Sequence, residues 1–247
     1  MKKNWKTAGT SRSALKYVNS VINSMAKLYF LGGENVVKRD SREINEIAFR
    51  DAAESPRVVV FPWARASFDK SYKRRKRLFD YFRSLGACTV DFADYGDTFE
   101  EINRKVERSD LIYLPGGLAS VLVERLKKKS VDRLLRKYEG VVVGRSAGAL
   151  ALGKKCIVTK NRRNRTSRII SGIGLVDFSV KAHYKPSKDD ALKRLSKEEK
   201  IYAIAERSAL VYDNGCLSFM GNVYVFQNGE KAVVTEYQTL GASERFS

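Results

Sequence analysis

Short runs of β-branched and aromatic residues alternate along this chain with longer stretches whose apolar positions recur at the spacing of a helix. Up to residue 145 the pattern predicts strands at 27–31, 57–61, 88–92, 110–114 and 140–143. Helices are predicted between them, at 42–53, 70–85, 99–107 and 118–129. Strands separated by helices are typical of an α/β fold with a mostly parallel, doubly wound sheet and helices on both faces.

After about residue 155 the pattern changes to strands joined by short turns. Strands are predicted at 156–159, 169–173, 202–206, 216–220, 223–227 and 232–236, with one helix near 189–200. We expect them to form the edge of the same sheet and hairpins that complete it. Residues 25–247 are therefore predicted to form a single α/β domain, for which 43% hydrophobic residues supply a full core.

Residues 1–24 differ from the rest because they contain basic residues but no acidic one. They lack an apolar core long enough for a secretory signal. We interpret them as a basic leader or tail outside the fold. The alternative is a working chain that starts at Met25, directly before the first predicted strand.

The sequence argues against a membrane-spanning protein and against a cysteine-based metal site. No apolar run approaches the roughly 20 residues that span a bilayer. The three cysteines, Cys88, Cys156 and Cys216, are far apart and show no metal-type pairing. We expect a cytoplasmic protein with reduced thiols and no membrane partner. The sequence leaves a homo-oligomer open.

The net charge of +19 raises the hypothesis of nucleic-acid binding. Basic residues cluster at 70–77, at 125–137 and in the loop 162–168. The first two clusters lie in segments of helical periodicity, so we interpret them as solvated faces of surface helices. No nucleic-acid-binding motif accompanies them, and we do not expect nucleic acid as a partner. The third cluster is a candidate site for an acidic substrate.

The pentapeptide 144–148, Gly-Arg-Ser-Ala-Gly, follows a buried strand and precedes an Ala/Leu run that predicts a helix. This is the context of a nucleophile elbow, a strained strand-to-helix turn that exposes a serine. Glycines on either side allow the strand and helix to approach closely. The simpler alternative is a glycine-rich turn with an incidental serine. We favour Ser146 as a nucleophile at the carboxyl end of the sheet, where ligands of such sheets bind.

A serine hydrolase also needs a base and donors for the developing oxyanion. His183 is the only histidine in the chain. The backbone N–H of Ala147 is one candidate donor. Gly116 and Gly117, after the preceding predicted strand, form either a tight turn or a loop that brings a second N–H to the substrate.

The acid that would orient His183 has two candidates. Asp177 is the only carboxylate between Ser146 and His183, as the α/β-hydrolase order would require, but it lies very close to His183 in sequence. Glu206 ends a predicted strand, where a carboxylate can point into a site. We favour Glu206, although a surface residue beside Arg207 is the alternative.

Several short motifs occur along the chain in the order in which the peptidase E family carries them. On these motifs, the chain from about 25 to 236 resembles that family of aspartyl dipeptidases, which are related to cyanophycinases. The motifs are Tyr-Leu-Pro-Gly-Gly at 113–117, Gly-Arg-Ser-Ala-Gly-Ala at 144–149, Gly-Ile-Gly-Leu at 172–175 leading to Ala-His-Tyr at 182–184, Ala-Ile-Ala-Glu at 203–206 and Gly-Asn-Val-Tyr-Val-Phe at 221–226.

The resemblance implies a fold similar to class I glutamine amidotransferase domains and a triad of Ser146, His183 and Glu206. It implies cleavage of short peptides with an N-terminal aspartate, without a metal or organic cofactor. Cyanophycinase-like hydrolysis of β-aspartyl peptides is the alternative within the same chemistry. Two further alternatives are a catalytically silent protein that binds an acidic ligand, and a nucleic-acid-binding protein.

Besides Gly116, three residues are candidates for contacts with the substrate. Leu118 stands where the family usually has Asn or Gln after the glycine pair, and Arg162 stands where aspartyl dipeptidases carry an aspartate. A cation at 162 is compatible with an acidic substrate. Arg194, on the predicted helix after His183, is either a third contact or a solvated helix residue, and we favour the latter.

Overall fold

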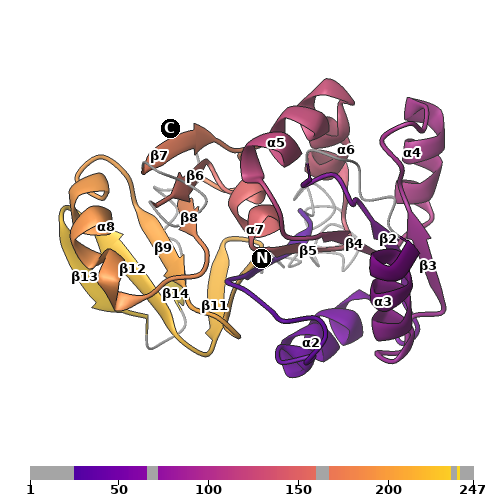
Figure 1. Cartoon of the computed structure of the whole chain (residues 1–247), viewed down its shortest axis with the longest axis horizontal. Helices are drawn as coiled ribbons and strands as arrows, with labels where there is room; N and C mark the ends of the chain where they lie inside the picture. Colours follow the sequence, from indigo (N-terminus) through magenta and orange to yellow (C-terminus); the bar gives the residue numbers. More distant parts are fainter. Residues whose placement is uncertain (1–24, 66–71, 160–166, 235–237, 240–247) are drawn as a thin grey trace, which may run out of the picture.

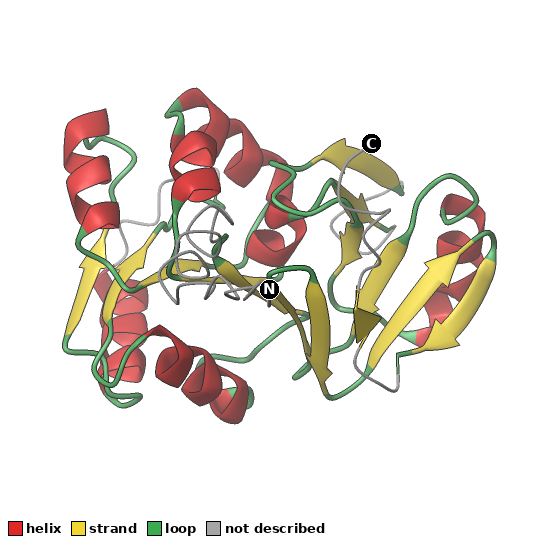
Figure 2. Cartoon of the chain, turned by 180° about the vertical axis from the view of Figure 1, so that it is seen from behind, coloured by secondary structure: helices red, strands yellow, loops and turns green. Residues whose placement is uncertain are grey.

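The computed structural model describes residues 25–65, 72–159, 167–234 and 238–239. These residues form two β-sheets that lie side by side, with helices around both (Figures 1 and 2). The first sheet has eight strands and the second has six. We call them sheet A and sheet B. The mixed sheets and their helices confirm the predicted α/β class.

The parallel part of sheet A contains the strands predicted from the first half of the sequence. Their order is β1-β5-β4-β2-β3, and each neighbouring pair is parallel. The carboxyl ends of β1, β4 and β5 therefore meet at one edge of the sheet. The strands are β1 (Lys27–Leu31), β2 (Arg57–Val60), β3 (Thr89–Phe92), β4 (Leu111–Leu114) and β5 (Val141–Arg145).

Six helices cover the two faces of this parallel sheet. The apolar residues of α2 (Arg42–Ala52) and α3 (Tyr72–Arg83) pack on one face. Those of α4 (Phe99–Glu107), α5 (Ala119–Lys128), α6 (Val131–Lys137) and α7 (Ala147–Leu152) pack on the other. Helices on both faces confirm the doubly wound arrangement (Figure 2).

Sheet B was not predicted as a separate sheet, since we expected the later strands to form the edge of the first sheet and hairpins that complete the domain. Three of them extend the first sheet, since β10 (Ala209–Asp213), β11 (Cys216–Met220) and β14 (Gln238–Thr239) follow β1 as antiparallel strands. The other six form sheet B in the order β13-β12-β9-β8-β6-β7. They are β6 (Lys155–Val158), β7 (Arg168–Ser171), β8 (Ser179–Lys181), β9 (Ile201–Ile204), β12 (Val223–Gln227) and β13 (Glu230–Val233).

Three strands, β8, β10 and the two-residue β14, and the helix α6 were not predicted as elements, and one predicted helix ends early. β8 is only three residues long, which is too short for an alternating pattern to be recognised. β10 carries the apolar run Ala-Leu-Val-Tyr directly after a turn. The helix predicted near 189–200 consists of a 3₁₀ turn, η1 (Pro186–Lys188), and a short helix, α8 (Asp189–Leu195). Ser196, which caps α8, is buried and bonds to the loop after β12, so tertiary contacts end the helix early.

Phe178, directly before β8, packs at the junction of the two sheets. Its ring centroid lies 5.6 Å from that of Phe30 on β1 and 4.8 Å from that of Tyr202 on β9. Its side chain belongs to a hydrophobic core that contains residues of both sheets and of α7. The junction is therefore apolar and closely packed.

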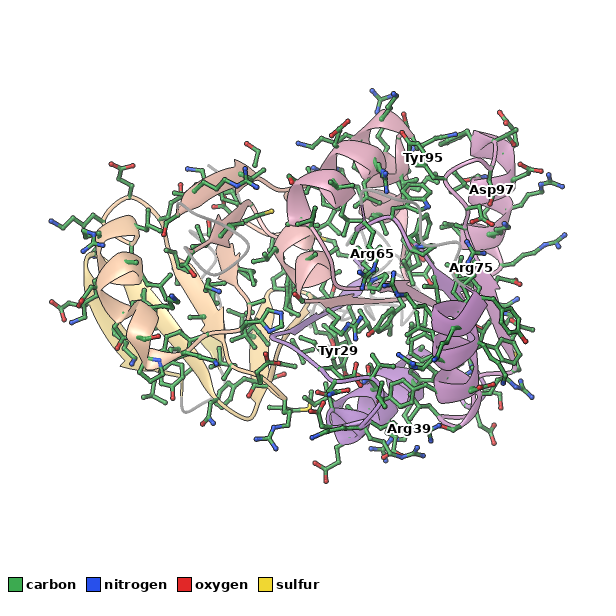
Figure 3. All side chains as sticks on the ribbon, viewed as in Figure 1. Tyr29, Arg39, Arg65, Arg75, Tyr95 and Asp97 are labelled. Atoms are coloured by element: carbon green, nitrogen blue, oxygen red, sulfur yellow. The ribbon has the colours of Figure 1, made fainter. Side chains whose placement is uncertain are left out.

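Several cations of the basic clusters are used within the fold. Arg75 on α3 pairs with Asp94, and Lys76 pairs with Asp80 at 2.7 Å. Lys129 donates to the carbonyl of Asp97 at 2.9 Å and lies 5.3 Å from the ring centroid of Tyr95. Figure 3 shows Tyr95 and Asp97 on the α4 and α5 side of sheet A. In the described residues, no helix is both long and apolar enough to cross a membrane.

Truncating Phe178 tests whether both sheets unfold as one unit. Phe178→Ala should lower the free energy of unfolding by about 3–5 kcal/mol, because it leaves a cavity between the sheets. Urea unfolding followed by both circular dichroism and tryptophan fluorescence should retain one shared transition. Phe79→Ala, at a position 43% exposed on α3, is the control and should change little. Two separated transitions would show that the sheets are independent units.

Candidate active site

Ser146 occupies a strained turn between β5 and α7. Its φ is 53° and its ψ is −104°, a conformation that residues with a side chain rarely adopt. The flanking glycines allow the close approach that the sequence predicted. A Cβ on Gly144 would lie 2.6 Å from the carbonyl carbon of Gly148, and one on Gly148 would lie 2.1 Å from the oxygen of Leu114. The turn therefore needs glycine at both positions.

His183 lies just past the end of β8 and reaches Ser146 from the second sheet. Its Nε2 is 2.6 Å from Ser146 Oγ. The backbone of His183 also has a positive φ, 53°, and its N–H donates to the carbonyl of Gly32 at 2.9 Å. A side chain of sheet B is thus held against the carboxyl edge of sheet A.

Glu206, in the loop after β9, contacts the other nitrogen of the imidazole. Its Oε1 is 2.5 Å from His183 Nδ1. This hydrogen bond is the main reason why the pKa of Glu206 lies below its ordinary value, and the charges of His183, Lys185 and Lys181 lower it further. A carboxylate ionised at neutral pH can fix the tautomer of the imidazole and stabilise the imidazolium.

Asp177, the other candidate acid, is not part of this arrangement. Its side chain is 65% exposed and pairs with Lys154 at 2.8 Å. The hydrogen-bonded set that the structure brings together is Ser146, His183 and Glu206.

Lys181, two residues before His183, was not singled out in the sequence. It is buried on β8, and its ammonium donates to the carbonyl of Ala182. Its pKa is lowered to about 8, chiefly by burial and also by the charge of Lys188, while Glu206 acts in the opposite direction. A buried lysine thus contributes positive charge near Glu206.

Gly32 and Gly33, directly after β1, are the second feature that sequence reasoning missed. Gly33 lies against the imidazole and the carboxylate, because a Cβ there would be 2.0 Å from Glu206 Oε2 and 2.6 Å from His183 Cε1. Its carbonyl accepts the N–H of Arg207 at 3.0 Å. The available signal was a glycine pair at the carboxyl end of a strand next to the one that carries Ser146.

The predicted oxyanion donors lie close to Ser146. Ala147 is the first residue of α7, and Gly116 is near enough that a Cβ on it would be 3.3 Å from Ser146 Cβ. The N–H groups of Gly117 and Ala147 donate to no other described residue. Gly117 packs on the loop after β2, since a Cβ on it would lie 2.2 Å from the oxygen of Ala64.

The other three candidate substrate contacts, Leu118, Arg194 and Arg162, lie at different distances from the site or outside the described residues. Leu118 is next to Gly117 and is 42% exposed, while its N–H donates to Ala64 at 2.5 Å. Arg194 is exposed on α8, which packs against β12 and β13 at the outer end of sheet B (Figure 1). The structure does not bring Arg194 to Ser146. Arg162 lies outside the described residues.

The model of peptidase family S51 matches residues 28–219, which include Ser146, His183 and Glu206. The chain belongs to peptidase family S51. It is 28% identical over 141 residues to a peptidase of Listeria monocytogenes, Lmo0363, which is described as uncharacterized. That match covers 51% of this chain and 68% of the Listeria protein.

Two solved structures share the fold of this S51 chain. A peptidase from an acI-B1 Actinobacterium superposes with a TM-score of 0.65 at 19% identity, covering 88% of this chain and 98% of its own. A Listeria monocytogenes protein provisionally described as a peptidase E superposes with a TM-score of 0.61 at 20% identity, covering 79% and 98%. These likenesses agree with the predicted class I glutamine amidotransferase-like fold.

The S51 chain offers no obvious metal centre in the part that the structure describes. No three His, Cys, Asp or Glu side chains gather there in a way that could hold a metal ion.

Gly33→Ala tests whether Gly33 determines the position of the imidazole and the carboxylate. The new methyl group would displace both side chains, and an error of about 1 Å can cost roughly 100-fold in rate. We expect kcat for peptide hydrolysis to fall by that order while the circular dichroism spectrum is unchanged. Gly96→Ala is the matched control, because a Cβ there would meet nothing within 4 Å. Normal turnover by Gly33→Ala would contradict this role.

Lys181→Met tests the cost of burying the ammonium. Below pH 8 the lysine is protonated in both the folded and the unfolded chain, so the folded state bears the whole cost, about 3 kcal/mol. As the pH rises through about 8, only the folded chain loses the proton and the cost declines. Urea unfolding should show Lys181→Met more stable than the wild type at pH 7, with a smaller difference at pH 10. The exposed Lys197→Met is the control, and a difference that does not change with pH would contradict the interpretation.

Proposed function

We propose that this S51 peptidase is a serine peptidase that hydrolyses short peptides, and that its preferred substrates are dipeptides with an N-terminal acidic residue. The observation that carries the proposal is the chain of two hydrogen bonds from Ser146 Oγ through the imidazole to Glu206, 2.6 and 2.5 Å long. A serine, a histidine and a carboxylate in this geometry are the parts of an acyl-transfer site.

In the acylation step His183 Nε2 accepts the proton of Ser146 as Oγ attacks the scissile carbonyl carbon. The imidazolium that forms is stabilised by the carboxylate of Glu206. The negative charge on the former carbonyl oxygen is stabilised by the N–H groups of Ala147 and Gly117. The imidazolium then gives its proton to the leaving amine, and the acyl group stays on Ser146.

In the deacylation step a water molecule replaces the leaving amine beside His183. The imidazole accepts its proton as the oxygen attacks the ester, and the same two N–H groups stabilise the second oxyanion. Return of the proton to Ser146 Oγ releases the acid product.

The preference for short acidic peptides is supported by the resemblance to peptidase E and by the net charge of +19. Cyanophycinase-like hydrolysis of β-aspartyl peptides would use the same serine. A panel of α-aspartyl, β-aspartyl and neutral dipeptides, scored by the free amino acid released, separates these substrates. Release from neutral dipeptides only would contradict the acidic preference.

Replacing the nucleophile should abolish the activity. Ser146→Ala should reduce kcat by about 10⁶, the order seen when a triad nucleophile is removed. Its circular dichroism spectrum should match that of the wild type. Its unfolding midpoint should be equal to that of the wild type or slightly higher, because the strained turn loses a polar side chain. A variant that retains normal turnover would exclude Ser146 as the nucleophile.

Glu206 and Asp177 can be compared directly. Glu206→Gln should lower kcat by about 10³–10⁴, because the amide cannot stabilise the imidazolium. Asp177→Asn is the matched control and should change only its exposed pair with Lys154. If Asp177→Asn alone lost activity, the assignment of the acid would be wrong.

A further inference from the structure

Arg145, the residue directly before Ser146, has no role in the chemistry described above. It is the last residue of β5, where side chains alternate between the two faces of sheet A. Gly144 faces α7, whereas Val143 belongs to the core beneath α2 and α3. The side chain of Arg145 therefore leaves the sheet on the α2 and α3 face, at the edge where the serine lies.

The guanidinium of Arg145 uses few of its five donors. Nη1 donates to the backbone carbonyl of Glu34 at 3.5 Å, the limit of a hydrogen bond. Nε is buried without any hydrogen-bond partner, and no ion pair with a described residue involves this arginine. An unpaired buried donor is costly, and such a group in a folded protein calls for a specific explanation.

The nearest acid, Glu34, is engaged elsewhere. Its carboxylate accepts hydrogen bonds from Asn45 Nδ2 at 3.1 Å and from the hydroxyl of Tyr113 at 3.5 Å. Burial raises the pKa of Glu34, while a hydrogen bond with Tyr81 and the charge of Arg145 act in the opposite direction. Asn45 is fully buried, and its Oδ1 also has no partner. Two buried polar atoms in this region, Arg145 Nε and Asn45 Oδ1, therefore lack a hydrogen-bond partner.

Gly116 connects this guanidinium with the nucleophile. A Cβ at Gly116 would lie 3.3 Å from Ser146 Cβ and 3.7 Å from both Nε and Nη2 of Arg145. Since glycine has no side chain there, the space beside Ser146 adjoins the guanidinium of Arg145. A substrate whose carbonyl is at Ser146 would place its adjoining groups next to the guanidinium.

We propose that Arg145 determines specificity by binding a carboxylate of the substrate beside the scissile bond. The proposal rests on the proposed peptidase function of Ser146. A guanidinium with several free N–H groups binds a carboxylate in a bidentate manner, which favours it over a neutral amide. The carboxylate is either the side chain of the N-terminal residue or the C-terminal carboxylate of a dipeptide.

Four substrates separate these two sources: Asp-Ala, Asn-Ala and the C-terminal amide of each. Arg145→Gln should raise KM roughly 10- to 100-fold for the substrates that carry the recognised carboxylate, with a smaller effect on kcat. If the loss affects both Asp peptides and neither Asn peptide, the ligand is the side chain. If it affects both free acids and neither amide, the ligand is the C-terminus. Arg145→Lys should recover part of the affinity, because it retains the charge.

Arg104→Gln, at an exposed arginine on α4, is the matched control and should leave all four values of KM unchanged. An Arg145→Gln variant that changes no KM, or changes all four equally, would overturn the proposal. A wild type that hydrolyses none of the four peptides would instead overturn the proposed function. In that case, binding of Asp-Ala to the Ser146→Ala protein would be measured by calorimetric titration. Binding that is lost in the double variant Ser146→Ala/Arg145→Gln supports the arginine site. Equal binding by the single and double variants, or no binding by the single variant, overturns it.

Discussion

The site depends on backbone hydrogen bonds that tie Gly32 and Gly33 to the loops carrying the histidine and the acid. The carbonyl of Gly32 accepts the N–H of His183 at 2.9 Å, and that of Gly33 accepts the N–H of Arg207 at 3.0 Å. The N–H of Gly32 donates to Ser208 at 3.0 Å. Ser146 follows a strand of sheet A, whereas His183 follows a strand of sheet B. These backbone bonds hold the two sheets together beside the side-chain hydrogen bonds of the site. Those bonds join Ser146 Oγ to His183 Nε2 at 2.6 Å and His183 Nδ1 to Glu206 Oε1 at 2.5 Å.

The same region stores backbone strain. Ser146 and His183 both have a positive φ, 53° in each, and such conformations cost about 1–3 kcal/mol for residues with a side chain. The buried core between the sheets, with Phe178 against Phe30 and Tyr202, offsets this cost. Strain and packing together explain why the elbow and the histidine loop hold one conformation. A serine aimed at an imidazole by its own backbone loses little entropy when the reaction starts.

Much of the fold and of the site could be predicted from the sequence because the signals are local. The alternation of strands and helices identifies the parallel sheet, and the elbow places Ser146 at its carboxyl edge. The single histidine left one candidate base. The choice of Glu206 over Asp177 also came from the sequence, from chain order and the end of a predicted strand. The structure brings Glu206, and not Asp177, to His183.

What could not be predicted depends on contacts between distant segments. Gly33 has no local signal that connects it with His183, 150 residues away in sequence, and only the pairing of sheets A and B brings them together. Sheet B was not predicted as a separate sheet because strand pairing is non-local and β8 is very short. Arg145 was noted only as part of the pentapeptide 144–148, because the lack of a partner for its Nε is a property of packing.

The central claim is a covalent acyl-enzyme on Ser146, and mass spectrometry tests it most directly. The protein would be mixed with an activated aspartyl ester, quenched in acid during turnover and digested with trypsin. We predict that the peptide 146–154 gains the mass of one aspartyl group, and that neither the Ser146→Ala protein nor any other peptide does. Continued turnover of the ester with an unmodified 146–154 peptide, or with the adduct on another residue, would contradict the account.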